Sequence, residues 1–583
     1  MRASSSADST TAKRSHRSGQ VEQAPARGSG EGLSEPADAT LGRASTSAQA
    51  SKATTTVRDA TLDLLRRLEM TTVFGNPGST ELPFLNNWPS DFRYVLALQE
   101  ASVVAMADGF ARATGRAAFC NLHSAAGVGH ALGNVFTAYR NQAPLVITAG
   151  QQARGLLPML PFLGATQAAE FPKPYVKWSV EPARAADVPA AIAHAYYIAM
   201  QRPRGPTFVS IPIDDWRREA AAVTPRTVAG DVAPDPDQLR AVLDDLAQSR
   251  RPALIIGPEV DEERAGDLAV AVAERVQASV WASPFSCRVS FPEEHPLFAG
   301  FLAAAPEAVA DALSAYDLII VLGAPVFTFH VEGKCALFDS SIPIRHVTSD
   351  PEVAASAPVG NAIVASLRLT LAELVARLAP QPQRAVPQRR KRKPLPDPAD
   401  PIPAAYLMHA IDQARAGDAI VVEEAPSHRP AMQDYLPMRS YGGFYTMASG
   451  GLGYSLPASV GISLANPGRR VICLIGDGSM MYSVQALWTA VQHGLPLTVI
   501  VINNGGYGAM RAFSQTLKVQ SPPGIDLPGL DFVQLAASMG CVGTRIKAAA
   551  DLPAALASAM NSLRPSLVEV IVDAAIPKLY DEL

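Results

Sequence analysis

The fold is decided by Val471-Ile-Cys-Leu-Ile-Gly-Asp-Gly-Ser479, where five apolar residues run directly into a Gly-Asp-Gly turn. A short apolar run bounded by turn residues is typical of a strand buried in a parallel sheet. The residues that follow predict a helix over Tyr482–His493 and a second apolar strand over Leu497–Ile502, which ends at two asparagines. Strand, helix and strand in this order predict one βαβ unit, in which Asp477 and Asn504 follow the carboxyl ends of parallel strands.

Asp477 and Asn504 supply oxygen ligands of the kind that Mg²⁺ prefers. Neighbouring parallel strands lie about 4.8 Å apart, so side chains at adjoining strand ends can share one ion. The carboxylate and the amide would be completed by the backbone carbonyl of Gly506, a water and phosphate oxygens. Gly478 lets the backbone approach a phosphate, and Ser479 is predicted to open a helix whose free N–H groups favour an anion.

Either motif alone, Gly-Asp-Gly or Asn-Asn-Gly-Gly, would be interpreted as a turn. Together, with 24 residues between Gly478 and Asn503, they favour a metal-diphosphate site. This spacing resembles the thiamine diphosphate fingerprint. Two competing phosphate motifs fail, since no GxxxxGK[ST] string occurs and no GxGxxG follows a strand with an acidic residue some 20 positions on.

The composition excludes several function classes. The chain has 583 residues, and 50 Lys and Arg against 54 Asp and Glu give a net charge of −4. It therefore lacks the net positive charge that would attract nucleic acid or an anionic membrane. No apolar run approaches the 18 residues of a membrane-spanning helix. The five cysteines form no CxxC pair and no zinc-ligand spacing. We therefore expect no nucleic-acid partner, no membrane partner and a cytoplasmic location.

Short apolar β-rich runs alternate with alanine-rich amphipathic stretches from about residue 55 onward, which predicts parallel sheets covered by helices. The predicted strands are Thr72–Phe74, Tyr94–Leu98, Ala117–Leu122, Leu145–Ala149, Thr207–Ile211, Ala253–Ile256, Leu318–Leu322, Ala419–Val422, Val471–Ile475 and Leu497–Ile502. We expect a disordered tail over 1–54, three α/β domains over 55–230, 231–385 and 403–583, and a proline-rich basic linker over 386–402.

Four more residues are candidates on local grounds, each with an ordinary alternative. Glu100 begins a helical run, where an acidic residue most often complements the helix dipole. His123 follows an apolar strand and precedes a turn of small residues, a place that favours function. His295, in Glu-Glu-His-Pro, is typical of a surface loop, and Ser79, after Pro-Gly, is typical of a helix N-cap.

A set of motifs resembles the thiamine diphosphate-dependent 2-oxo acid decarboxylases, and within them the benzoylformate decarboxylase branch. The motifs are Phe74-Gly-Asn-Pro-Gly-Ser-Thr-Glu-Leu-Pro83, Leu98-Gln-Glu-Ala101, Asn121-Leu-His-Ser-Ala-Ala-Gly127, Thr148-Ala-Gly-Gln-Gln152, Val176-Lys-Trp-Ser179, Gly450-Gly-Leu-Gly453 and Asn503-Asn-Gly505. The resemblance extends from about residue 57 to about 575. It implies three doubly wound parallel-sheet domains: a pyrimidine-binding domain over 55–230, a central Rossmann-like domain over 231–385 and a diphosphate-binding domain over 403–583.

The resemblance also implies roles for individual residues. Glu100 is the cofactor activator, Ser79 holds the substrate carboxylate, and His123 and His295 are the acid/base histidines, a task suited to a side chain that titrates near neutrality. The implied cofactor-binding residues are Asn76, Pro77, Gly78, Glu100, Ser427, His428, Gly450, Leu452, Gly478, Ser479 and Tyr507, and the metal ligands are Asp477, Asn504 and Gly506. The implied substrate pocket consists of Ser79, Phe162, Leu163, Met447, Ala509, Met510 and Phe513.

The segment Glu424-Ala-Pro-Ser-His-Arg429 departs from the family pattern, because the best-known member has a run of small hydroxyl residues here. Pro426 cannot donate an N–H, so one expected contact to phosphate is lost. We expect the charge of Arg429 to compensate. Phe162 and Met447 also stand where the familiar member has smaller residues, which indicates a difference in substrate size or ring substituents.

The resemblance implies the non-oxidative decarboxylation of an aromatic 2-oxo acid, benzoylformate to benzaldehyde and CO₂, with thiamine diphosphate and Mg²⁺ or Ca²⁺, in a homodimer or a dimer of dimers. Two alternatives stay open: a carboligase of the acetohydroxyacid synthase type and a catalytically silent scaffold. Ser79 and His123 favour protonation over capture of a second oxo acid, and Glu100, His123, Asp477 and Asn504 count against the scaffold. No glycine-rich fingerprint supports flavin in the central domain.

Overall fold

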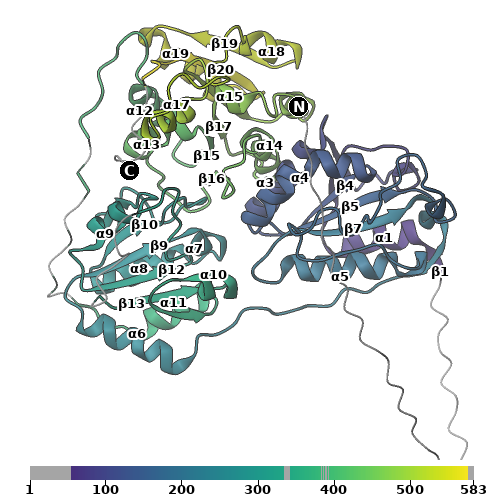
Figure 1. Cartoon of the computed structure of the whole chain (residues 1–583), viewed down its shortest axis with the longest axis horizontal. Helices are drawn as coiled ribbons and strands as arrows, with labels where there is room; N and C mark the ends of the chain where they lie inside the picture. The colour runs from purple at the N-terminus through teal and green to yellow at the C-terminus, as the bar shows by residue number, and fades with distance from the viewer. Residues whose placement is uncertain are drawn as a thin grey trace, which may run out of the picture. The chain divides into compact units, whose positions relative to one another are not determined.

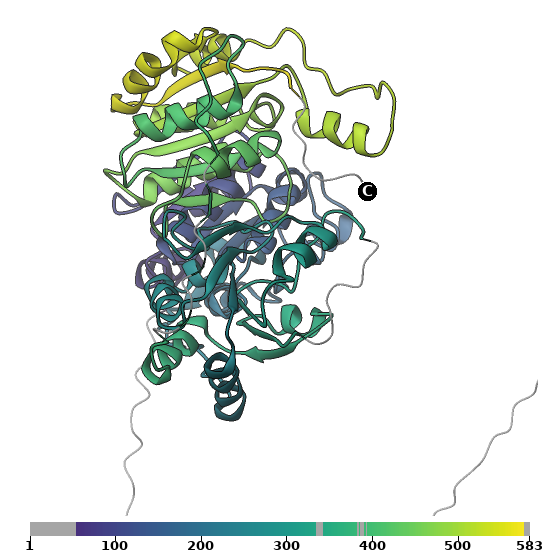
Figure 2. The same cartoon turned by 90° about the vertical axis from the view of Figure 1, so that its left-hand side faces the viewer.

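The computed structural model describes residues 54–333, 342–381, 384, 387, 390–391 and 393–575. The tail predicted over 1–54 lies outside the described residues apart from Thr54, and so do parts of the linker predicted over 386–402. The described chain contains three six-stranded parallel sheets and one small antiparallel pair, β1 (Thr54–Thr56) with β8 (Glu219–Ala221) (Figures 1 and 2). The predicted α/β class with three parallel sheets is confirmed.

The first sheet has the strand order β3-β2-β4-β5-β7-β6. Its strands are β2 (Thr72–Gly75), β3 (Arg93–Leu96), β4 (Ala118–Leu122), β5 (Leu145–Gln151), β6 (Ser179–Val180) and β7 (Thr207–Pro212). Its helices are α1 (Val57–Arg67), α2 (Leu82–Leu85), α3 (Glu100–Thr114), α4 (Ser124–Arg140) and α5 (Val188–Met200). Phe119 and Cys120, neighbours on β4, pack into different hydrophobic cores, so both faces of the sheet are covered.

The second sheet has the order β11-β10-β9-β12-β13-β14. Its strands are β9 (Pro252–Ile256), β10 (Ser279–Ala282), β11 (Phe298–Phe301), β12 (Leu318–Leu322), β13 (Ile344–Thr348) and β14 (Asn361–Val364). Its helices are α6 (Pro236–Gln248), α7 (Pro258–Glu262), α8 (Gly266–Val276), α9 (Pro306–Leu313), α10 (Pro351–Ser356) and α11 (Leu367–Arg377). The sequence predicted only β9 and β12, the two central strands that are wholly buried and therefore wholly apolar.

The third sheet has the order β16-β15-β17-β18-β20-β19. Its strands are β15 (Ile420–Glu424), β16 (Phe444–Thr446), β17 (Val471–Gly476), β18 (Leu497–Asn503), β19 (Val542–Ile546) and β20 (Ser566–Ile571). Its helices are α12 (Ala404–Ala414), α13 (Arg429–Tyr435), α14 (Ser455–Ala465), α15 (Asp477–Met480), α16 (Ala486–Gln492), α17 (Gly508–Thr516), α18 (Phe532–Ser538) and α19 (Leu552–Asn561). Each sheet lies within one predicted domain range; the boundaries themselves stay predictions.

The predicted βαβ unit is present, because β17 pairs in parallel with β18 and Gly476 lies opposite Ile502. The predicted helix over Tyr482–His493 is wrong in its first part. After the one-turn α15, the backbone N–H groups of Tyr482 and Ser483 donate to carbonyls three residues earlier, and regular α-helix resumes only at Ala486. These tight turns replace the helical i to i−4 pattern that the sequence suggested.

Helices α3 and α14 pack closely and join the first and third sheets (Figure 1). A Cβ on Gly109 would lie 2.3 Å from the carbonyl oxygen of Ala458, and one on Gly461 would lie 1.8 Å from that of Met106. Only glycine allows this approach of two backbones. Glu100, which begins α3, and the loop that precedes α14 are therefore held by one rigid pair. No helix in the described part of the chain combines the length and apolarity that a bilayer crossing requires.

Candidate active site

The turn after β17 is joined to the loop after β18 through Asp477. The Oδ1 atom of Asp477 accepts a hydrogen bond from Gly478 N at 2.7 Å, and Oδ2 accepts one from Gly506 N at 2.8 Å. Asp477 and Asn504 are 3% and 7% exposed. Burial raises the pKa of Asp477 above its usual range. The structure thus brings the three predicted metal-binding residues into two touching loops, where a cation would offset the cost of a buried carboxylate.

The predicted ligands of this site are oxygen donors, the type that magnesium prefers. Among the described residues, no group of three or more His, Cys, Asp or Glu side chains is placed to hold a metal. The predicted set has one carboxylate, one amide and one backbone carbonyl, and it leaves positions for water and phosphate oxygens. Such mixed oxygen donors suit Mg²⁺ or Ca²⁺ and not zinc.

Two glycines allow larger side chains to gather around the Gly-Asp-Gly turn. A Cβ on Gly478 would lie 2.4 Å from the ring of Tyr507, and a Cβ on Gly508 would lie 2.6 Å from Asn504 Nδ2 and 2.9 Å from Ser427 Oγ. Ser427 and Asn504 therefore flank Gly508, Tyr507 follows the predicted ligand Gly506 in the chain, and Ser479 lies two residues after Asp477.

His428 provides a test of whether these residues fit a polar ligand. Its side chain is buried, burial lowers its pKa to about 4, and within the described structure its Nδ1 atom has no hydrogen-bond partner. A buried polar atom without a partner is costly and usually indicates a missing ligand or water. His428 follows Ser427 in the turn after β15, so the residues present fit a diphosphate held with a cation.

Arg429 does not take the role expected from the sequence. Its guanidinium forms an ion pair with Glu423 and donates to Thr446 Oγ1 at 2.9 Å. Glu423 is 1% exposed, so this guanidinium neutralises a buried carboxylate of β15. The expectation that Arg429 supplies the diphosphate with a compensating charge is therefore not supported.

Glu424 fixes the end of the loop that carries Gly450 and Leu452. Its buried carboxylate accepts three backbone hydrogen bonds, from Gly453 N at 2.7 Å, Tyr454 N at 2.9 Å and Ser455 N at 2.7 Å. These N–H groups belong to the start of α14, where they have no partner inside the helix. Burial raises the pKa of Glu424 to about 7. The sequence analysis treated Glu424 only as part of a divergent segment.

The raised pKa of Glu424 predicts a pH dependence of stability. Because the folded chain holds the Glu424 proton up to about pH 7 whereas the unfolded chain releases it near 4.5, this group lowers stability as pH rises from about 4.5 to 7. We expect the Glu424→Gln variant, whose amide cannot titrate, to lack this loss of stability between about pH 4.5 and 7. Thermal unfolding of both proteins without cofactor measures it: the melting temperature of the wild type relative to the variant should fall across this window, and a constant difference would contradict the assignment.

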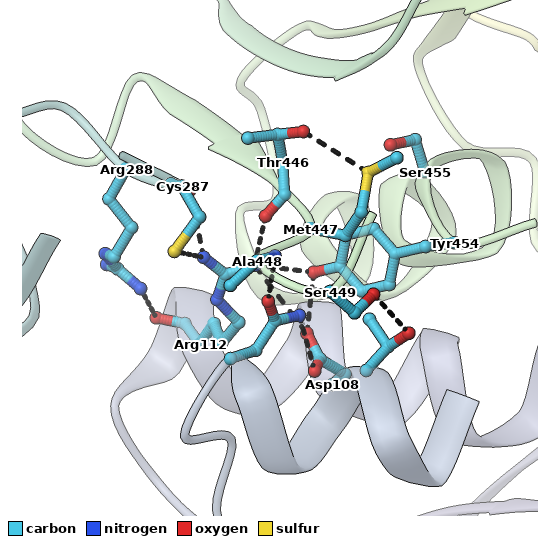
Figure 3. Close-up of polar contacts among 12 residues, drawn as sticks. Asp108, Arg112, Cys287, Arg288, Thr446, Met447, Ala448, Ser449, Tyr454 and Ser455 are labelled. Atoms are coloured by element: carbon cyan, nitrogen blue, oxygen red, sulfur yellow. Dashed lines mark hydrogen bonds and ion pairs between the residues drawn. The ribbon is translucent and has the colours of Figure 1, made fainter. Parts of the chain in front are cut away.

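A buried polar core holds the other end of the same loop (Figure 3). Arg112 of α3 donates to the carbonyl oxygen of Thr446 at 2.9 Å, to Tyr454 Oη at 2.8 Å and to the carbonyl oxygen of Cys287 at 3.0 Å. Tyr454 Oη donates in turn to Asp108 Oδ1 at 2.6 Å. Arg112 and Asp108 are 6% and 1% exposed, so these bonds form in a dry interior, where they are strong.

Helix α4 adds two more contacts to this loop. Asn141, which follows α4, accepts a hydrogen bond from Ala448 N at 2.8 Å, and Thr137 Oγ1 lies 2.9 Å from Ser449 Oγ. The segment between Thr446 and Ser455 is thus pinned at both ends, while Gly450 at its middle is exposed. This arrangement leaves the predicted cofactor contacts of Gly450 and Leu452 on a rigid but accessible loop.

Glu100 lies at the first position of α3, as the sequence predicts. It is 9% exposed, and its Oε2 atom lies 3.2 Å from His130 Nδ1. A Cβ on Gly127 would lie 3.2 Å from Glu100 Cγ, so α4 leaves room for the acidic side chain. His130 was missed by the sequence analysis because it belongs to another helix, 30 positions away.

The turn that carries Ser79 follows β2, and His123 follows β4, the neighbouring strand; Ser79 itself is exposed. A Cβ on Gly78 would lie 2.2 Å from the His123 ring, so the Pro-Gly-Ser turn after β2 packs directly against the imidazole that follows β4. The His123 side chain is 18% exposed, and its Nδ1 atom lies 2.8 Å from Glu81 Oε2. Glu81 was also missed, since a Glu three residues after a small residue predicts only a local helix cap.

His295 has different neighbours. Its Nε2 atom lies 3.3 Å from Glu274 Oε1, and its ring centroid lies 5.1 Å from that of Phe291. It also lines a small cavity together with Glu293, Phe298 and Arg390. None of these contacts involves Ser79 or His123, so the acid/base role of His295 stays a prediction.

The predicted substrate-pocket residues lie on four separate segments: Ser79, 162–163, Met447 and 509–513. Phe162 and Met510 are 87% and 51% exposed, whereas Leu163, Met447, Ala509 and Phe513 are partly buried. The ring of Phe513 lies 4.9 Å from that of His330. The apolar pocket that these residues were expected to form stays a prediction.

The geometry predicts that Asp477→Ala weakens cofactor binding, because it removes the one carboxylate that the two loops share. We expect the affinity for thiamine diphosphate in the presence of Mg²⁺ to fall by about 100-fold, at the upper end of what lost contacts around a metal cost. Calorimetric titration of the apoprotein measures it. Asp551→Ala is the matched control, since Asp551 is exposed and makes no side-chain cap bond. Undiminished binding by Asp477→Ala without metal would contradict the site.

Comparisons with known proteins agree with this geometry. Three family descriptions match: Thiamine pyrophosphate enzyme, N-terminal TPP binding domain, over residues 55–170; the central domain over 239–374; and the C-terminal TPP binding domain over 425–570. Benzoylformate decarboxylase of Pseudomonas aeruginosa is 43% identical over 520 residues, which are 88% of this chain and 98% of that protein.

Two solved structures are also similar. Benzoylformate decarboxylase from Polynucleobacter necessarius is 40% identical with a TM-score of 0.87, over 89% of this chain and 99% of that one. The 4-hydroxybenzoylformate decarboxylase of Rhodococcus jostii RHA1 is 40% identical with a TM-score of 0.86, over 91% and 100%. The chain therefore belongs to the thiamine diphosphate-dependent 2-oxo acid decarboxylases, enzymes that use this cofactor together with a divalent metal.

Proposed function

We propose that the chain decarboxylates an aromatic 2-oxo acid without oxidation, and that benzoylformate is its substrate, giving benzaldehyde and CO₂. The observation that carries this proposal is the packing of the turn at Gly78 and Ser79 against the His123 ring. Ser79 follows Gly78 in this turn, so the packing supports a site that combines a hydroxyl suited to a carboxylate with an imidazole suited to proton transfer. The similarity to benzoylformate decarboxylases over nearly the whole chain supports the choice of substrate.

Each residue then has one task. Ser79 binds the substrate carboxylate, and His123 donates and recovers the protons that the carbonyl oxygen and the product carbon require. Glu100 exchanges a proton with the pyrimidine ring of the cofactor. Thiamine diphosphate, when bound, supplies the carbon nucleophile and the electron sink for the loss of CO₂. Asp477, Asn504 and the carbonyl of Gly506 hold Mg²⁺, and Ca²⁺ is the alternative ion.

We also propose that the active enzyme is a homo-oligomer. Several large apolar side chains on or near the predicted site loops are exposed in the single chain: Leu98, Met159, Leu160, Phe162 and Tyr482 are 46%, 67%, 84%, 87% and 56% exposed. Three of these side chains belong to one short segment, 159–162, and an exposed apolar patch is typical of an interface. A second copy would cover it, and the molar mass by light scattering tests this. The buried free cysteines at 120, 287, 473 and 541 support a reducing compartment such as the cytoplasm.

A turnover panel decides between the candidate functions. The purified protein with thiamine diphosphate and Mg²⁺ is given benzoylformate, 4-hydroxybenzoylformate and pyruvate, with Asp477→Ala as the inactive control. We expect CO₂ and an aromatic aldehyde, with benzoylformate turned over fastest. Acetolactate formed from pyruvate would favour the carboligase, and no CO₂ from any acid at neutral pH would favour the scaffold.

A further inference from the structure

Glu81 is a buried carboxylate to which the proposed chemistry gives no task. The residue is 1% exposed, yet four donors surround its two oxygens. Oε1 accepts from Gly150 N at 2.9 Å and from Thr80 Oγ1 at 2.6 Å, while Oε2 accepts from Gly78 N at 2.9 Å and lies 2.8 Å from His123 Nδ1. A carboxylate has about four acceptor sites, so this one is saturated, and its buried charge is supported from every side.

These contacts determine which nitrogen of His123 carries a proton. The single hydroxyl proton of Thr80 is donated to Glu81, so toward His123 Nδ1, 3.1 Å away, Thr80 presents a lone pair. Both neighbours of Nδ1 are therefore acceptors, and Nδ1 must be the donor. In the neutral ring this leaves Nε2 as the basic nitrogen. All hydrogen bonds of the ring within the described residues use Nδ1.

We propose that Glu81, assisted by Thr80, is a positioning residue that holds His123 as the Nδ1–H tautomer and reserves Nε2 for proton exchange with the substrate. This inference rests on the proposed function. A carboxylate that orients a histidine fixes both its tautomer and its ring plane, and loss of such a partner removes catalysis without removing the histidine.

The surrounding backbone is shaped to fit the Glu81 carboxylate. A Cβ on Gly150 would lie 2.0 Å from Glu81 Oε1, and one on Gly78 would clash with the His123 ring. Tyr94 is also influenced by this carboxylate: burial, with the charge of Glu81 added, raises the pKa of Tyr94 far above its usual range. Tyr94 therefore stays neutral and adds no competing charge to the pair.

The first test measures the tautomer directly and needs no turnover. Histidine ¹⁵N chemical shifts are recorded for the cofactor-loaded wild type, for Glu81→Gln and for Glu69→Gln, and His123→Gln assigns the His123 signals. Glu69 is the matched control because it is an exposed glutamate paired with Arg116 on the surface. We expect Nδ1–H in the wild type and in Glu69→Gln, and a shift toward Nε2–H in Glu81→Gln. An unchanged His123 pattern in folded Glu81→Gln would overturn the proposal.

The second test is kinetic. Glu81→Gln should lower kcat for benzoylformate by about 10- to 100-fold. KM and cofactor affinity should change less, because the glutamine amide keeps one oxygen that can accept from Gly78 N and Ser79 is not replaced. If that variant does not fold, Thr80→Val, which removes one acceptor of His123 Nδ1, one donor to Glu81 and little volume, should give a smaller loss of the same kind. A wild-type kcat in either folded variant would refute the role. A wild type without any turnover would instead refute the proposed function. The nitrogen shifts need no turnover, so they test the contact between Glu81 and His123 independently of that function.

Discussion

Glu100→Gln should abolish the exchange of the C2 proton of bound thiamine diphosphate with solvent. Glutamine has the size of glutamate but cannot take up or release a proton, so the pyrimidine ring loses its partner. The loss should reach about 10²- to 10⁴-fold, the range of a positioned acid or base. Exchange in deuterated buffer, quenched with acid and read by proton NMR, measures it.

The surroundings of Glu100 make this experiment interpretable. Gly127 leaves space beside the side chain, and His130, the hydrogen-bond partner of the carboxylate within the described residues, is 64% exposed, so an isosteric amide should fit without disturbing α3. Glu69→Gln again serves as the control. Exchange at the wild-type rate in a Glu100→Gln protein that still binds the cofactor would remove Glu100 from its role.

His123→Ala should slow turnover of benzoylformate by about 10²- to 10⁴-fold and leave cofactor binding largely intact. The reason is that the role proposed for His123 is proton exchange with the substrate, and that His123 belongs to a different strand end from the proposed metal-diphosphate loops. Steady-state kinetics together with cofactor titration separate the two effects.

The substitution of His123 needs two controls. His194→Ala removes an exposed histidine whose ring packs on Trp178, and it should be nearly silent. His123→Gln is a second variant, because alanine leaves the buried Glu81 carboxylate without one of its four donors, which costs stability by itself. Near-normal kcat in both His123 variants would show that another group carries the protons.

The strand ends at which the metal-diphosphate site is proposed could be predicted because neighbouring residues specify them. A fully buried parallel strand is a short apolar run bounded by turn residues. The Gly-Asp-Gly turn and the two asparagines each follow such a run directly, so adjacent residues were enough to position β17, β18, Asp477 and Asn504. The same reasoning missed β13, where Arg345 and His346 interrupt the apolar pattern, and β14, which is largely exposed. It also extended a helix through residues 482–485, since periodicity does not distinguish α-helix from successive tight turns.

The sequence by itself determined the fold class, the β17–β18 unit at which the cofactor site is proposed, and the two strands that precede Ser79 and His123. Only the tertiary structure decided how these groups are held: Glu81 meets His123 across 42 positions, Glu424 meets Gly453 across 29, and Arg112 meets Thr446 across 334. Periodicity and turn chemistry act over a few neighbouring residues, whereas a buried charge finds its partners only once the sheets and helices have packed.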